Sequence, residues 1–290
     1  MSSAVNVFHG RFARIALCRL ERGIIAHAHR EGHFLFHVDG STGHMNVHGA
    51  QYPISGRVAL MIDPWQAHAY VPDSAVGQYL LVMCIRPTWF HNFQDETRSW
   101  SVNGATSFLV TPKLARTIAQ AVALSSEGGR EGMLDCVVHC LVADSCRLTR
   151  EADEGPQMSR WLTQSADFRI RKSIRLMGDR FDANFDVARL ATDSGLSRPH
   201  FFKLFRKQIG VTPKMFWNAL RLERAFQDLV ETGKPLADIS FELGFSSQSS
   251  FSRFFAMNTG LAPSDYRRAG HIVSGGAQDR ARGRGVTAAS

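Results

Sequence analysis

Residues 236–268, LADISFELGFSSQSSFSRFFAMNTGLAPSDYRR, contain the pattern of two short helices separated by a glycine-centred turn. Ile239 and Leu243 stand four residues apart, as neighbours on one face of a helix do, and Gly244 supplies the break that a tight turn needs. Ser246 is suited to cap the helix that follows. A short helix, a turn and a second helix with a polar, cationic face is the helix-turn-helix arrangement.

The same pattern occurs about fifty residues upstream, in VARLATDSGLSRPHFFKLFRKQIGVTPKMF (residues 187–216). The turn glycine, the capping serine, two apolar aromatics and the terminating glycine all recur. The matched pairs are Gly195 with Gly244, Ser197 with Ser246, Phe201 with Phe251, Phe205 with Phe255, and Gly210 with Gly260. The offset changes from 49 to 50 residues, so the second copy holds one extra residue near the start of its second helix. Agreement of two copies is much stronger evidence than one motif match.

A longer helix is predicted between the two copies. Thr212 can cap it, Pro213 fits its first turn, and Gly233 ends it. Arg221 and Arg224 are expected to face solvent. A helix of about 18 residues is roughly 27 Å long. It could therefore place two recognition helices in successive major grooves, about 34 Å apart.

The segment from about Phe168 to Arg268 resembles the DNA-binding domain of AraC/XylS-type transcription regulators. RLERAF (221–226), ADISFELGFSSQSSFSRFF (237–255) and the G-x-x-P-x-x-Y-R ending at residues 260–267 carry this resemblance. It implies a sequence-specific transcription regulator, expected to be an activator and not an enzyme. The implied partners are double-stranded DNA, a small-molecule effector and RNA polymerase.

The charge distribution agrees with a polyanionic partner. Residues 165–290 hold 20 basic and 12 acidic side chains, a net charge of +8, whereas residues 1–150 hold 13 and 11, a net charge of +2. Basic charge concentrated in the half that carries the duplicated motif favours binding to a nucleic acid.

Candidate DNA contacts follow from the resemblance, position by position. The expected base contacts are Arg198, His200, Phe202 and Lys203 in the first recognition helix, and Gln248, Ser249, Ser252 and Arg253 in the second. Arginine and lysine can donate to guanine N7 and O6, and glutamine can pair with adenine. Phe202 could contact a thymine methyl group or be buried. The expected phosphate contacts, which position the protein without specifying sequence, are Lys172, Arg175, Arg206 and Lys207.

The N-terminal part has the pattern of a β structure. Short apolar runs such as Phe34–Val38, Val58–Ile62 and Tyr79–Ile85 are separated by glycine-containing turns. Many short strands favour a small barrel or jelly roll. The segment from His27 to His68 resembles, more loosely, the cupin-like sensor barrel of this regulator family. The expected fold class is therefore α+β: a cupin-like β-barrel with two dimerisation helices, then an all-α domain with two helix-turn-helix motifs joined by a linker helix.

Four histidines approximate the metal-ligand spacing of enzymatic cupins: His27, His29, His33 and His68. His27 and His29 alternate by two and so share one strand face, as paired ligands must. The acid that such enzymes carry after the paired histidines is replaced by His33, and Glu31 is offset by two. We therefore expect neither a metal nor a cofactor. The alternative is a metal-dependent cupin enzyme fused to a DNA-binding domain, which bound metal and turnover would support.

An effector pocket is expected inside the barrel, lined by inward-facing aromatic and imidazole side chains. The candidates are His27, His29, Phe36, Tyr52, Trp65 and His68. Their chemistry could favour a small aromatic or acidic molecule. Alternatively, the aromatics simply fill a closed barrel core.

Residues 111–150 switch to helical periodicity. An apolar stripe that begins at Met133 and ends at Val142 could pack on the barrel of its own chain or pair with a second chain. Helices at this place in resembling proteins often make the dimer, so we expect a homodimer.

The domains expected from the sequence are 1–150, effector sensing and dimerisation; 151–164, a linker; 165–268, DNA binding, with motifs at about 186–210 and 236–260; and 269–290, a disordered tail. No run of 18 apolar residues exists, so no membrane partner is expected. The first residues lack the apolar core of a signal peptide, and the expected location is cytoplasmic.

Overall fold

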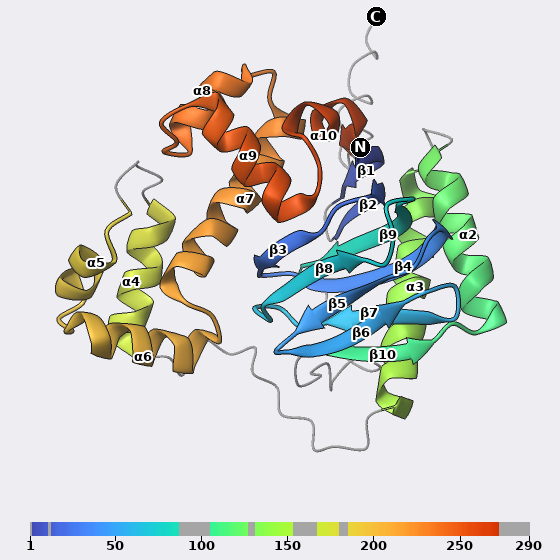
Figure 1. Cartoon of the computed structure of the whole chain (residues 1–290), viewed down its shortest axis with the longest axis horizontal. Coiled ribbons are helices and arrows are strands. Elements are labelled where there is room, and N and C mark those ends of the chain that lie inside the picture. The colour runs from blue at the N-terminus through green and yellow to red at the C-terminus, as the bar shows by residue number, and fades with distance from the viewer. Residues whose placement is uncertain are drawn as a thin grey trace, which may run out of the picture.

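A computed structural model describes residues 2–10, 13–86, 105–126, 131–152, 167–179 and 185–272. A sheet-rich N-terminal half is followed by a helical half, so the expected α+β organisation is confirmed (Figure 1). Most of the expected linker, 151–164, lies outside the described residues. None of the helices in the described ranges combines the length and the apolar character that crossing a membrane requires.

Within the described residues the strands form two sheets, built from the N-terminal half together with one strand from residues 270–272. Their strands are β1 (Ser3–His9), β2 (Ala13–Leu20), β3 (Ile24–His27), β4 (Gly32–Gly40), β5 (Gly43–Val47), β6 (Ala50–Ile54), β7 (Val58–Ile62), β8 (His68–Pro72), β9 (Gln78–Ile85), β10 (Ala105–Leu109) and β11 (Gly270–Ile272). One sheet has the order β10-β7-β4-β9-β2-β1-β11, and the other has the order β3-β8-β5-β6. This two-sheet arrangement agrees with a small barrel or jelly roll, and the cupin assignment itself stays a prediction.

The seven-stranded sheet has an apolar core on each face because successive side chains of a strand point in opposite directions. On β4, Leu35 faces the four-stranded sheet, where it joins a core with Met45 and Ile54. Phe34 and Phe36 face the other way and pack with α2 (Pro112–Ser126) and α3 (Glu131–Ala152). Figure 1 shows these two helices covering the outer face of the sheet.

The apolar stripe of α3, from Met133 to Val142, packs mainly against its own chain. Leu134, Val138 and Leu141 are buried in the core that α2 and α3 share with the sheet. Met133 remains exposed. Intrachain packing therefore accounts for most of the stripe, and dimerisation through it stays a prediction.

The helical half contains seven helices within the described residues. They are α4 (Phe168–Asp179), α5 (Val187–Asp193), α6 (Arg198–Ile209), α7 (Pro213–Glu231), α8 (Leu236–Glu242), α9 (Gln248–Thr259) and α10 (Pro263–Ala269). The pairs α5–α6 and α8–α9 are the two helix-turn-helix motifs, and α7 connects them (Figure 1).

The two motifs have the same turn geometry. Gly195 and Gly244 have φ values of 70° and 71°, a region that glycine occupies without steric cost. Ser246, expected to cap α9, does not do so: the cap is Ser247, whose side chain accepts a hydrogen bond from the Ser250 amide. The extra residue of the second copy thus lies in the turn before the helix. In the first copy Ser197 stands at the expected cap position, but its side chain makes no capping hydrogen bond.

Arg221 on α7 is not solvent-facing as expected, since only 8% of it is exposed. Its Nε donates a hydrogen bond to the Leu243 carbonyl at 2.8 Å, and its guanidinium lies 3.5 Å from the centre of the Phe245 ring. Leu243 ends α8, where helix carbonyls lack partners within the helix. Arg221 therefore holds the turn of the second motif, whereas Arg224 is exposed as expected.

The segment expected to be a disordered tail is ordered at its start. Ala269 ends α10, and Gly270–Ile272 form β11, which pairs in parallel with β1. β1 would otherwise be an edge strand with unpaired backbone groups, and β11 satisfies some of them. Residues 273–290 lie outside the described residues.

Gly260 gives a test of how the second motif packs on the sheets. Its φ is 75°, and a methyl group added there would lie 2.9 Å from Leu20 Cδ2 and 3.4 Å from Ile24 Cγ1. Gly210 ends α6 with a similar φ of 90°, but an added methyl group would meet only the Trp65 carbonyl oxygen, at 3.6 Å. Both Gly→Ala changes should cost about 1 kcal/mol through backbone strain.

We expect Gly260→Ala to lower the free energy of unfolding more than Gly210→Ala does, because only Gly260→Ala adds crowding against β2 and β3. Denaturant unfolding of the two variants and the wild type measures the difference. Equal losses would show that the α9 end does not pack against these strands in solution.

Candidate nucleic-acid interface and effector pocket

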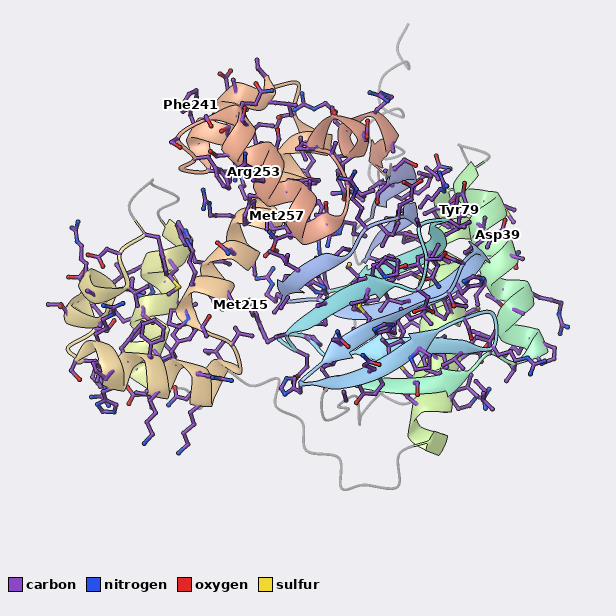
Figure 2. All side chains as sticks on the ribbon, viewed as in Figure 1. Asp39, Tyr79, Met215, Phe241, Arg253 and Met257 are labelled. Atoms are coloured by element: carbon purple, nitrogen blue, oxygen red, sulfur yellow. The ribbon has the colours of Figure 1, made fainter. Side chains whose placement is uncertain are left out.

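Both recognition helices, α6 and α9, expose most of the residues expected to contact bases. On α6, Arg198, His200 and Lys203 are exposed and Phe202 is half-buried. On α9, exposed side chains are those of Gln248, Ser249 and Arg253, with Ser252 half-buried. Figure 2 shows Arg253 among the side chains of α9. The structure thus brings the eight candidates onto two helices, four on each.

Buried aromatics fix the orientation of these helices. Phe201 and Phe205 of α6, and Phe251 and Phe255 of α9, have no exposed surface. Residues four apart lie on the same face of a helix, so these pairs anchor one face and leave the polar face outward. Gly210 and Gly260 then end the two helices in left-handed conformations.

The expected phosphate contacts differ in their surroundings. Arg206 and Lys207 are exposed in the last turn of α6, and Arg175 is exposed on α4. Lys172 already has a partner, because its Nζ donates to the Asp193 carbonyl oxygen at 2.6 Å. It therefore ties α4 to the end of α5, and contact with a phosphate would have to share or replace that bond.

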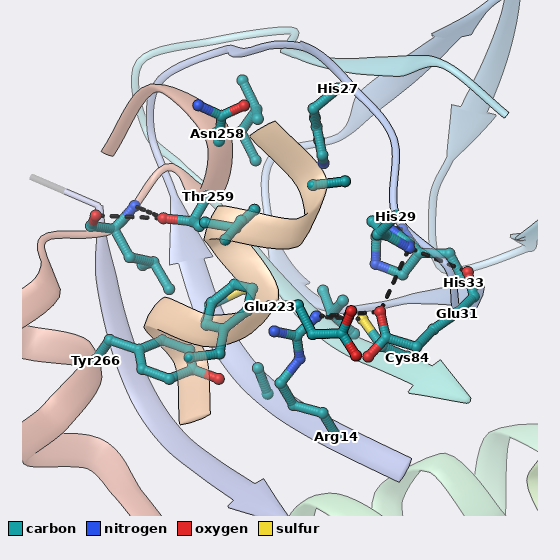
Figure 3. Close-up of a pocket in the computed structure, with 18 of the residues that line it drawn as sticks. Arg14, His27, His29, Glu31, His33, Cys84, Glu223, Asn258, Thr259 and Tyr266 are labelled. Atoms are coloured by element: carbon teal, nitrogen blue, oxygen red, sulfur yellow. Dashed lines mark hydrogen bonds and ion pairs between the residues drawn. The ribbon is translucent and has the colours of Figure 1, made fainter. Parts of the chain in front are cut away.

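A pocket lies between the sheets and the helical half (Figure 3). Its volume is about 90 Å³. The sheet side contributes Arg14, Ala16, Cys18, Leu20, Ile24, His27, His29, Arg30, Glu31, His33, Leu35, Met45, Val82 and Cys84, and the helical side contributes Ala219, Leu222, Glu223, Phe226, Asn258, Thr259, Leu261 and Tyr266. The pocket is thus walled by both halves of the protein.

Only two of the six residues expected to form the effector pocket line this pocket, His27 and His29. Phe36 does not, because it lies on the face of β4 that packs against α2 and α3. Tyr52 is half-buried on β6 and packs at the core between the sheets. Trp65 stacks on Phe216 of α7, with ring centres 4.6 Å apart, and so contacts the helical half outside the pocket.

Charged groups at the pocket are paired. Arg14 lies with its guanidinium 3.6 Å from the centre of the Phe226 ring, and its Nη2 donates to Cys84 Sγ at 3.3 Å. Arg30 forms an ion pair with Glu223 of α7 at 2.9 Å. Burial raises the pKa of Glu223, an effect that the Arg30 charge opposes. The Arg30–Glu223 pair therefore joins the two halves at the rim of the pocket.

A histidine cluster forms one end of the pocket. His27 and His68 are cross-strand partners on β3 and β8, and His33 and Cys84 are partners on β4 and β9. His29 lies in the connection between β3 and β4, so His27 and His29 do not share one strand as expected. Burial lowers the pKa of His68 to about 3 and also lowers the pKa values of His27, His29 and His33, so the four imidazoles are neutral at pH 7.

Sequence reasoning missed the helical wall of the pocket. Leu222 and Phe226 belong to the apolar side of α7, and Tyr266 belongs to the family-like ending of the second motif. Their periodicity indicates burial but does not tell which surface buries them. Arg14 was missed because a lone arginine in a strand carries no signal of burial.

Comparison with known proteins agrees with the helical half of the structure. A family model described as a helix-turn-helix domain matches residues 190–269. The arabinose operon regulatory protein of Escherichia coli (strain K12) is 34% identical over 102 residues, 35% of each chain. The HTH-type transcriptional regulator MtrA of Neisseria gonorrhoeae is 23% identical over 142 residues, 49% of this chain and 47% of that protein. The chain spans about a third to a half of these curated relatives.

Solved structures extend the likeness to the whole fold. ToxT from Vibrio cholerae strain SCE256, in a structure described as bound to an unsaturated fatty acid, matches with a TM-score of 0.60. The match covers 89% of this chain and 95% of ToxT, at 12% identity, and therefore shows a shared fold alone. The duplicated motif, the matching family model and the similar regulators agree, and residues 190–269 are a helix-turn-helix domain of the AraC/XylS type.

Proposed function

We propose that this protein regulates transcription by reading two adjacent DNA segments with α6 and α9 and by sensing a small molecule between its two halves. The observation that carries the proposal is the duplicated motif, in which buried phenylalanines turn two polar helix faces outward. The fold likeness and the curated relatives support it.

The connecting helix suits this mode of reading. α7 has 19 residues, which makes it about 28 Å long at 1.5 Å per residue. Successive major grooves on one side of a duplex are about 34 Å apart. A connecting helix of this length supports two recognition helices that enter neighbouring grooves.

The proposed effector site is the pocket between the sheets and α7, α9 and α10. Its lining is mainly apolar, with the histidines, Arg14 and Glu223 as polar groups. ToxT structures are described with an unsaturated fatty acid and with a methylnaphthalenyl butenoic acid. We therefore favour an apolar effector with one acidic group.

Such an effector needs more room than the pocket offers. The pocket volume of about 90 Å³ is smaller than that of an engineered cavity of about 150 Å³ that admits benzene. Binding would have to widen the gap between the sheets and α7, and α7 carries both motifs. A ligand that prefers the widened arrangement shifts the protein toward it by its difference in affinity for the two arrangements.

The remaining parts of the proposal follow from the family. We propose that the protein acts as an activator through RNA polymerase, as a homodimer, in the cytoplasm where the chromosome lies. The relatives compared above are regulators, which favours a regulator over the fused cupin enzyme.

Arg253→Ala should relax base preference at one position of the binding site. An arginine that donates to a guanine edge contributes about 1–3 kcal/mol of discrimination. The measurement is selection of bound sequences from random DNA, with the wild type and the variant side by side. An unchanged base preference would exclude Arg253 as a base contact.

Arg206→Ala is the matched control for this experiment. Arg206 is exposed near the end of α6 and is expected to contact phosphate. Its loss should weaken binding to all sequences alike and reduce the slope of affinity against salt concentration by about one.

Ala16→Leu should block the effector site by filling the pocket from β2. With an unsaturated fatty acid as the probe, we expect the ligand to raise the melting temperature of the wild type. At a ligand concentration 100-fold above Kd, the stabilisation is about 2.7 kcal/mol. Ala69→Leu on β8, which does not line the pocket, should respond as the wild type does. An equal response of Ala16→Leu would place the ligand elsewhere.

A further inference from the structure

We propose that His27, His29, His33 and His68 form a binding site for one zinc-class transition-metal ion, at the end of the pocket where the two sheets meet. One nitrogen from each of His27, His29 and His68 lies within 4.8 Å of the other two. Metal binding at this site requires neither DNA nor the effector.

Backbone hydrogen bonds fix the tautomer of three of these rings. Nδ1 of His27 lies 2.9 Å from the Ile25 carbonyl oxygen, and Nδ1 of His68 lies 2.8 Å from that of Gln66. Nδ1 of His29 lies 3.0 Å from the Glu31 carbonyl oxygen. A carbonyl oxygen only accepts, so each Nδ1 carries the proton.

The free lone pair of each of these neutral rings is therefore on Nε2. A metal-binding histidine usually has this arrangement, in which one ring nitrogen donates to a carbonyl or carboxylate and orients the other toward the ion. The three rings are held in the same way, and one nitrogen of each lies within 4.8 Å of the other two, so they offer a set of three ligands.

His33 supplies the fourth nitrogen. Its Nδ1 lies 3.2 Å from His29 Nε2 and 3.3 Å from His68 Nε2. A proton on His33 Nδ1 can satisfy one of these two lone pairs well, but then His33 Nε2, which is buried, has no partner among the described residues. With its proton on Nε2, His33 would instead direct the lone pair of Nδ1 toward His29 Nε2 and His68 Nε2. In either tautomer of His33, the cluster has more nitrogen lone pairs than N–H groups to donate to them. A bound cation would accept these lone pairs.

Two of the separations between these nitrogens suit a small tetrahedral ion. Zinc–nitrogen bonds of about 2.0–2.1 Å place two ligands of a tetrahedral site about 3.3 Å apart, close to the two distances measured from His33 Nδ1. Four imidazoles without a carboxylate favour zinc, nickel or copper over magnesium or calcium. Zinc fits best, because it accepts a closed four-coordinate site.

Two neighbouring groups, Cys84 and Glu31, are poorly placed to act as further ligands. Cys84 lies near His29 and His33, but its Sγ accepts a hydrogen bond from Arg14, and burial raises the pKa of the thiol. The Glu31 carboxylate lies 3.9 Å from His29 Nδ1, the nitrogen that already donates to a carbonyl. Its negative charge lies 3.9 Å from Arg14 and offsets the repulsion that this arginine would exert on a metal cation. The four imidazoles remain the ligand set.

The test uses the full-length protein without a histidine tag. Chelator-treated protein is titrated with Co²⁺, followed by the visible absorption of tetrahedral cobalt, and Zn²⁺ is then added to displace it. We expect one equivalent of metal per chain and a rise in melting temperature on binding. Metal binding at less than one equivalent, or without the tetrahedral spectrum, would overturn the proposal.

Variants assign the binding to the cluster. His29→Gln and His68→Gln remove the Nε2 ligand and should weaken Zn²⁺ binding by at least about 100-fold, since even second-shell changes cost about 10–100-fold. His44→Gln on β5, whose ring pairs with Asp73 outside the cluster, should bind as the wild type does. Circular dichroism of the metal-free variants checks that they fold. Zn²⁺ binding that survives in folded His29→Gln and His68→Gln would mean an adventitious ion only.

Discussion

One apolar core holds the second helix-turn-helix motif to the sheet-rich half. Leu35 and Leu80 of the large sheet, Met45 of the small sheet, and Phe251 and Phe255 of α9 belong to the same buried cluster. Hydrophobic burial is the main favourable term in folding and is proportional to the area removed from water. The second motif is therefore packed firmly against the sheet-rich half. Pairing of β11 with β1 adds backbone hydrogen bonds between the second motif and the large sheet.

The first motif has a separate core. Phe201, Phe205 and Phe216 are buried with one another, and among the described residues of the sheet-rich half only Ala28 and Trp65 join them. The stack of Trp65 on Phe216 is thus the main apolar contact of this motif with the barrel. Because α7 is shared by both cores, a change in the gap between the sheets and α7 would act on the two motifs unequally.

The histidine cluster and the pocket lie on the same boundary. His27, His29 and His33 line the pocket, and His68 is buried beside them. Burial lowers the pKa values of all four rings. An ion there would connect β3, β4 and β8, the strands that form this end of the pocket.

Local sequence determined the helical half of the protein. Turn glycines, caps and phenylalanines spaced by four act within a few residues, so the pattern read twice in residues 187–268 already predicts both motifs and the outward faces of α6 and α9. Tertiary structure alone decided which side chains are buried and which of them meet at the pocket. It buried Arg221 against Phe245 and directed Phe36 away from the pocket. It also brought His27 next to His68, because burial partners and strand register join residues far apart in the chain, which no local pattern encodes.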